Sequence, residues 1–242
     1  MKRFLILANN GSKYHRDPRW PKYNVAFLSW FLSFAEYEVV SVLNQPKTIL
    51  LKSVESFISN ASPNDMTFIY IAGIGGKRNG VNTFLSYEYS NIDEGVVDIG
   101  DILSKFQGKP VVVFIDVFSP RTSFQKFNFT DCAIQNCYIA FSCSSMQGPV
   151  ADGTTFTGKI IHSLFGHSGT TLSHALDCFQ IAMNQNQKIG KTACIYDNMQ
   201  QNSKQVNLQG VLNNQNYQSQ KSEPTDFTWV CEVWEKLQDK ED

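Results

Sequence analysis

The chain has 242 residues, of which 42% are hydrophobic and 18% are charged, and its formal net charge is −1. This composition fits one compact domain, or one domain with an extension. A net charge near zero gives no general attraction to nucleic acid or to an anionic membrane. No apolar run approaches the roughly 18 residues that a membrane span needs. We therefore expect no nucleic-acid partner and no membrane span.

The N-terminus, MKRFLILANNG, carries a short apolar segment at residues 4–8. This segment has about five residues, whereas the apolar region of a signal peptide has roughly 7–15. We therefore expect a first core strand there instead. The six cysteines include no C-x-x-C pair, and their spacing does not predict a zinc site. Without a leader we expect thiols in a reducing, intracellular and cytoplasmic setting, and no secretion. No metal or cofactor is expected.

Strand-like and helix-like runs then alternate along the chain. The strand-like runs lie at 4–8, 39–43, 66–72, 109–116, 137–143 and 192–196. Helical spacing of apolar residues marks 24–35, 48–58, 98–106, 155–165 and 170–184, and 83–97 resembles a hairpin. Such alternation predicts an α/β fold in three layers, with a mostly parallel six-stranded central sheet flanked by helices.

In such a sheet, function lies at the carboxyl ends of the strands. The third strand runs there into a glycine-rich stretch, FIYIAGIGGKRNG at 68–80, which we expect to form a loop. Its glycines have neither the spacing nor the lysine of a phosphate-binding loop. The prominent side chain of this loop is Ile74, which has no chemistry of its own.

The composition changes near residue 198. We divide the chain into a domain at 1–197 and, at 198–242, an arm rich in Asn and Gln with a C-terminal aromatic segment. Phe227, Trp229 and Trp234 need a surface to bury against, which predicts contact with a partner or with the domain itself. Trp20, in the stretch PRWPKY, is a further candidate for gripping a protein partner, and a weak signal for nucleic acid.

In their order and spacing, these motifs resemble the caspase–metacaspase family of cysteine peptidases over roughly residues 1–197. The stretch YIAGIGG resembles the family's Gly-His-Gly loop, and VVVFIDVFSPRTS resembles the strand that ends in its Asp-x-Cys. The stretch from 139 to 164 resembles a further family pattern, which this chain matches at Gln147, Ala151, Asp152, Phe156 and Thr157. The resemblance implies a catalytic histidine after the third strand and a catalytic cysteine after the fourth.

The chain departs from the family at these two positions, where Ile74 and Phe118 stand. A cysteine peptidase needs a thiolate to attack and an imidazole to move the proton. Isoleucine carries no titrating proton, and phenylalanine has no lone pair with which to attack. We therefore expect no catalytic residues. A rebuilt dyad of Ser119 with His15 is the weak alternative.

The resemblance also points to a vestigial pocket. Its candidate binding residues are Asp116, Cys143, Gln147 and Asp152. Three of them also have a structural interpretation: Asp116 as an acceptor for loop amides, Cys143 as a small buried side chain, and Asp152 as a helix cap.

Metacaspases often need calcium. Here Asp93, Glu94 and Asp98 fit a solvated turn better than a calcium site.

Two functions remain open. The first is a catalytically inactive caspase-like protein that acts as a structural or regulatory protein-binding subunit, with other protein subunits, an active relative or a large assembly as partners. A structural role is favoured over peptide binding because Ile74 and Phe118 would fill part of the cleft. The alternative is a caspase-like cysteine endopeptidase with a rebuilt or non-standard active site.

Overall fold

A computed structural model describes most of the chain. The described residues are 2–10, 20–63, 65–89, 91–106, 108–119, 124–125, 127–129, 134–142, 156–165, 169–185 and 193–208.

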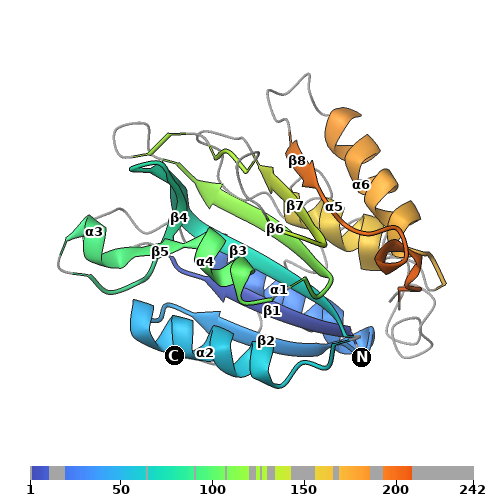
Figure 1. Cartoon of the computed structure of the whole chain (residues 1–242), viewed down its shortest axis with the longest axis horizontal. Helices are drawn as coiled ribbons and strands as arrows, with labels where there is room; N and C mark the ends of the chain where they lie inside the picture. The colour runs from blue at the N-terminus through green and yellow to red at the C-terminus, as the bar shows by residue number, and fades with distance from the viewer. Residues whose placement is uncertain are drawn as a thin grey trace.

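A twisted sheet forms the centre of the molecule (Figure 1). Its main strands run in the order β2-β1-β3-β6-β7-β8, and β4 and β5 extend it beside β3. All neighbours along the main order are parallel except β7 and β8, which are antiparallel. This confirms the expected mostly parallel, six-stranded order. The bounds are β1 Lys2–Ala8, β2 Glu38–Leu43, β3 Met66–Arg78, β4 Val81–Leu85, β5 Val96–Asp98, β6 Val111–Phe118, β7 Cys137–Ser142 and β8 Ala193–Asp197.

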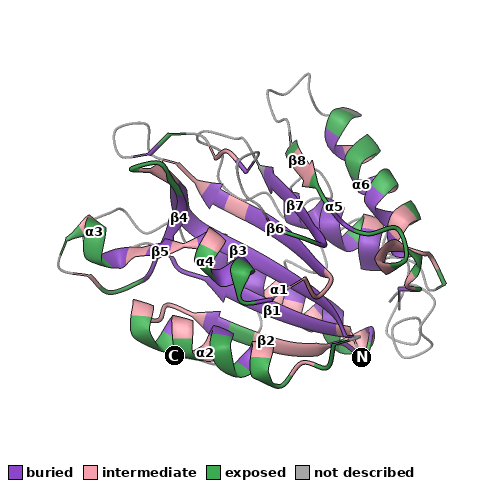
Figure 2. Cartoon of the chain, in the orientation of Figure 1, coloured by how far each residue is buried: buried purple, intermediate pink, exposed green. Residues whose placement is uncertain are grey.

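Helices cover both faces of the sheet, which makes three layers. The first core cluster lies under α1 (Trp20–Phe34), α5 (Phe156–Ile160), the π-helical turn η1 (Ile161–Phe165) and α6 (Leu172–Gln185). The second lies under α2 (Lys47–Ser59) and α4 (Ile99–Ser104). Strand residues alternate between the two clusters, so strands buried on both faces are apolar throughout. Figure 2 shows the central strands buried and the outer sides of the helices exposed.

The sequence predicted that the third strand ends at Ala72, but the strand is longer. It continues through the glycines to Arg78, turns at Asn79 and Gly80, and pairs with β4. Both turn residues have positive φ, +50 and +83, which is the backbone that an Asn-Gly hairpin turn requires. The predicted loop is thus one arm of a hairpin, and the short helix α3 (Ile92–Gly95) and β5 complete this extension.

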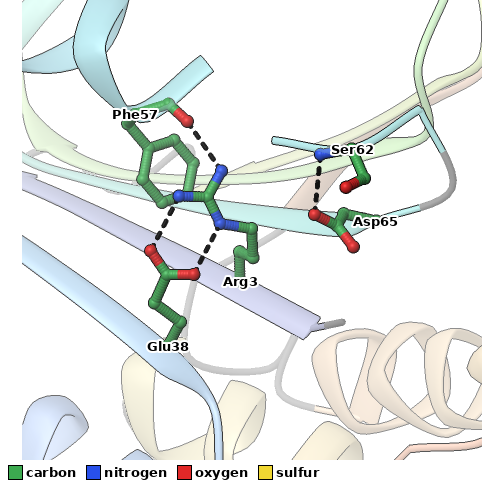
Figure 3. A network of polar contacts seen from close by, with 5 residues as sticks. All are labelled: Arg3, Glu38, Phe57, Ser62 and Asp65. Carbon is green, nitrogen blue, oxygen red and sulfur yellow. Dashed lines mark hydrogen bonds and ion pairs between the residues drawn. The ribbon is translucent and has the colours of Figure 1, made fainter. Parts of the chain in front are cut away.

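Arg3 ties three elements together at the opposite end of the sheet (Figure 3). Its guanidinium donates two hydrogen bonds to Glu38 of β2, at 2.8 and 2.7 Å, and one to the Phe57 carbonyl of α2, at 2.7 Å. It also lies 4.3 Å from the centre of the Phe57 ring. Arg3 is 1% exposed, so these contacts compensate for a buried charge. Nearby, Asp65 accepts a hydrogen bond from the Ser62 amide at 2.8 Å.

The first residues of the expected arm pack on the domain. Met199 and Leu208 both belong to the first core cluster, and the 3-10 turn η3 (Ser203–Gln205) lies between them. The amide of Asn198 donates to the Cys137 carbonyl at 2.9 Å, which continues the alignment of β8 with β7. The described core therefore extends to residue 208, beyond the expected division at 197.

No helix in the described ranges is both long enough and apolar enough to cross a membrane.

Candidate functional site

The two key positions of the sequence analysis lie side by side. β3 and β6 are parallel neighbours, with Ala72 beside Asp116 and Ile74 beside Phe118 in the register. The expectation that the strands ending near Ala72 and Asp116 are adjacent is therefore confirmed. Strands that run parallel end at the same edge, so this edge is where an active site would be built in such a sheet.

Apolar side chains occupy this edge. Ile74 is 2% exposed and forms a small cluster with buried Leu85 and Phe124. The half-buried residues packed against it are Tyr89, Ile92, Val96 and Phe118. The Tyr89 hydroxyl is the one polar side-chain group in this cluster. We call these seven residues the strand-end cluster.

The glycines beside the cluster are packed against protein. A Cβ added to Gly73 would lie 2.8 Å from the Asn9 carbonyl oxygen. One added to Gly76 would lie 2.6 Å from the Ser119 Oγ and 2.7 Å from the Gln125 carbonyl oxygen. Lys77 and Gln125 also exchange two backbone hydrogen bonds of 2.8 Å, which places the segment after β6 against the end of β3. A side chain at Gly73 or Gly76 would therefore collide with the chain itself.

Ser119, the weak nucleophile candidate, is half-buried directly after β6. His15, its expected partner, lies outside the described residues, so the dyad stays a prediction. The described part of the chain includes two histidines, His162 on η1 and His174 on α6, and both are exposed. His162 lies off the apolar stripe formed by Phe156, Ile160, Ile161 and Leu164, which accounts for its exposure.

Asp116 is the centre of a polar network beneath the cluster. Its Oδ2 accepts hydrogen bonds from Asn24 of α1 at 3.3 Å, from the Tyr70 hydroxyl of β3 at 3.2 Å and from Thr157 of α5 at 3.3 Å. These three donors are side chains from three elements. Tyr70 also lies 2.8 Å from the Thr157 hydroxyl and accepts from Asn24 at 3.0 Å.

Burial and the Asp116 charge raise the pKa of Tyr70 well above its usual value. Tyr70 therefore stays a protonated donor at neutral pH. All three hydrogen bonds are to the same oxygen, Oδ2. The network fits a structural link between β6, α1 and α5.

The other pocket and partner candidates cannot be placed. Cys143, Gln147, Asp152, Phe227, Trp229 and Trp234 lie outside the described residues. Trp20 begins α1, but its side chain also lies outside them.

The acidic residues that might suggest calcium are used elsewhere. Asp98 caps α4 by accepting from the amides of Gly100 and Asp101, and burial raises its pKa. Asp93 pairs with Arg78 at 2.8 Å, and the Glu94 carboxylate accepts a hydrogen bond from Asn91. Across the ranges that the structure covers, no three His, Cys, Asp or Glu side chains gather as a metal site would require. These residues do not fit a calcium site.

Sequence reasoning missed two groups of residues. Asn24 and Tyr70 join Asp116 only through the fold, and no local spacing indicates it. His174 and Cys178 lie four residues apart on α6, with the Cys178 Sγ 3.6 Å from the His174 Nε2. The i, i+4 spacing within a predicted helix could have identified this second pair.

Comparisons with known proteins identify the fold and the family of this chain. A search of curated proteins finds no match. Among solved structures, one described as pro-sf-caspase-1 superposes with a TM-score of 0.60 at 11% identity, covering 82% of this chain and 88% of that one. The shared fold includes the parallel sheet whose strand ends carry Ile74 and Phe118. A family model described as the caspase domain matches residues 2–207, and the chain thus belongs to the caspase domain family.

Proposed function

We propose that this chain is a catalytically inactive member of the caspase domain family that serves as a structural or regulatory protein-binding subunit of a larger complex. The observation that carries the proposal is the pairing of Ile74 with Phe118 at the ends of β3 and β6. These are the positions that correspond, by resemblance, to the family's histidine and cysteine.

The chemistry of the two side chains supports inactivity. Acyl transfer by a cysteine peptidase needs a nucleophilic sulfur and a group that accepts and returns a proton. Neither isoleucine nor phenylalanine can do either. Ile74 is also buried among apolar side chains, an environment that resists a charged intermediate.

A role through binding follows from what remains. Ile74 and Phe118 contribute apolar bulk at this edge, which favours a structural role over capture of a peptide there. Contact through outer surfaces, with other protein subunits as partners, is then the use that the domain retains. We place this function in a reducing, intracellular compartment, because the cysteines in the described ranges, Cys137, Cys178 and Cys194, are present as thiols.

A peptidase assay tests the chemical half of the proposal. The purified full chain should not hydrolyse peptides ending in Arg, Lys or Asp, with or without calcium. The alternative, an endopeptidase with a rebuilt site, predicts hydrolysis that is lost in Ser119→Ala and kept in Ser104→Ala. Ser104 is an exposed serine on α4 and provides a matched control.

Restoring the two side chains tests the correspondence of positions. The double variant Ile74→His, Phe118→Cys should react with an electrophilic peptide probe at the introduced thiol. Phe118→Cys alone, which lacks the imidazole, should react more slowly. Equal rates would show that the two positions do not form a catalytic geometry.

Native mass measurement tests the binding half. The tagged full chain, purified gently from its own cells, should migrate in a complex of defined stoichiometry and well above its own 27.4 kDa. Migration as a 27.4 kDa monomer under all conditions would contradict the proposal.

A further inference from the structure

The outer face of α6 carries a thiol and an imidazole in contact. Leu172, Ala175 and Phe179 turn toward the first core cluster, so the opposite side of the helix faces outward. His174 on that side is exposed and Cys178 is half-buried (Figure 2 shows the mixed exposure along α6). The Cys178 Sγ lies 3.6 Å from the His174 Nε2, within hydrogen-bonding distance for sulfur.

This contact suits proton transfer. Side chains four residues apart on a helix lie on the same face, so the pair needs no tertiary contact to form. The thiolate is the reactive form of cysteine, and a neighbouring imidazole that accepts the thiol proton leaves an ion pair that favours it.

The other described cysteines differ in their surroundings. Cys137 is completely buried in the second core cluster, where a small apolar side chain is what the packing needs. Cys194 is exposed on the edge strand β8. It therefore serves as a comparison for what exposure alone does to a thiol in this protein.

We propose that Cys178 is a modification site, a thiol that His174 deprotonates and that hydrogen peroxide oxidises. The thiol proton moves to His174 Nε2, and the thiolate sulfur attacks one peroxide oxygen. An S–O bond forms as the O–O bond breaks. Sulfur is oxidised to a sulfenic acid, and the peroxide is reduced. The departing hydroxide takes the proton back from the imidazolium and leaves as water. This site lies on α6 and does not depend on the strand-end cluster.

Thiol labelling of the full chain tests the pairing. Iodoacetamide is applied under native conditions, and the rate at each cysteine is followed by peptide mass spectrometry. Replacing His174 by Gln keeps a polar side chain but removes the base. The rate at Cys178 should fall about two- to fivefold, the factor that an exposed ion pair gives. The rate at Cys194 should not change.

Two controls make the result decisive. His162→Gln removes another exposed imidazole, on η1, and should leave the Cys178 rate unchanged. Hydrogen peroxide followed by a dimedone-type trap should add the sulfenic-acid adduct at Cys178, and less of it in His174→Gln. An unchanged Cys178 rate in His174→Gln, or no adduct at Cys178, would overturn the proposal.

Discussion

Gly73→Ala tests whether the glycine-rich part of β3 is a packed structure or an open cradle. Gly73 has a φ of +148, and a Cβ there would lie 2.8 Å from the Asn9 carbonyl oxygen. The Asn9 backbone cannot easily move away, because its amide donates to the Ala72 carbonyl at 3.0 Å. Its side chain also donates to the Leu85 carbonyl at 2.8 Å. The added methyl group therefore meets a fixed oxygen.

The expected loss of stability has three parts. Holding alanine at positive φ costs about 1–2 kcal/mol, and overpacking costs about 1–3 kcal/mol. Alanine also lowers the conformational entropy of the unfolded chain, which stabilises the folded state by about 0.4–1 kcal/mol. The net prediction for Gly73→Ala is a loss of about 2–4 kcal/mol. Gly80→Ala is the matched control, because Gly80 also has positive φ, +83, but has nothing within 4 Å of a Cβ. It should lose only about 1 kcal/mol.

Urea unfolding followed by far-UV circular dichroism measures both free energies. The two variants should unfold with similar slopes, so the midpoints report the difference directly. If Gly73→Ala loses no more than Gly80→Ala, there is room above Gly73. The stretch would then be open enough to receive a ligand, and our account of it as packed would be wrong.

Three further predictions concern other parts of the fold. Tyr70→Phe should lose about 1–3 kcal/mol of unfolding free energy because it breaks the Asp116 network, whereas Tyr138→Phe should lose almost none. The Tyr138 hydroxyl is buried and has no hydrogen-bond partner in the described part of the chain. Urea unfolding measures the free energy of both variants, and equal losses would contradict this prediction. The hydrogen bond from Arg3 lowers the pKa of Glu38 from the usual 4.5. The Glu38 carboxylate therefore stabilises the fold above pH 4.5, and this stabilisation is lost as the pH falls through the lowered pKa. Glu38→Gln should therefore flatten the fall in stability below that pH, and an unchanged acid profile would refute this. Ending the chain at 197 rather than after Leu208 should lower the unfolding midpoint by several degrees, since the core side chains of Met199 and Leu208 are removed; equal midpoints would contradict the packing of 198–208 on the domain.

The sheet was predictable because each of its central strands is marked by a pattern in the local sequence. Each central strand is a short apolar run between turn residues, and parallel strands buried on both faces need no further pattern. The continuation of β3 through its glycines was not predictable in this way. Glycine weakens a strand, and what holds this one is its pairing with β4 and the close approach of Asn9. Both depend on residues that the local sequence does not identify.

The site was predictable in position but not in detail. The placement of Ile74 beside Phe118 follows from strand order and register. The partners of Asp116 come from α1, β3 and α5, so they required the packing of helices on the sheet. Met199 and Leu208 were missed for a related reason. They are isolated apolar residues in a polar stretch, with no period to mark them as buried.

The strand-end cluster also bears on the variant that places a histidine at Ile74. Burying an isoleucine side chain contributes roughly 1.5–3 kcal/mol, and Ile74 is almost completely buried. A histidine at that position would lose this packing and bury polar nitrogens among apolar side chains. The restored double variant should therefore unfold more readily than the natural chain, even if its backbone has the required shape. Probe labelling in a folded but less stable variant would indicate that β3 and β6 still hold peptidase geometry. It would also indicate that a histidine at position 74 costs packing that the isoleucine supplies.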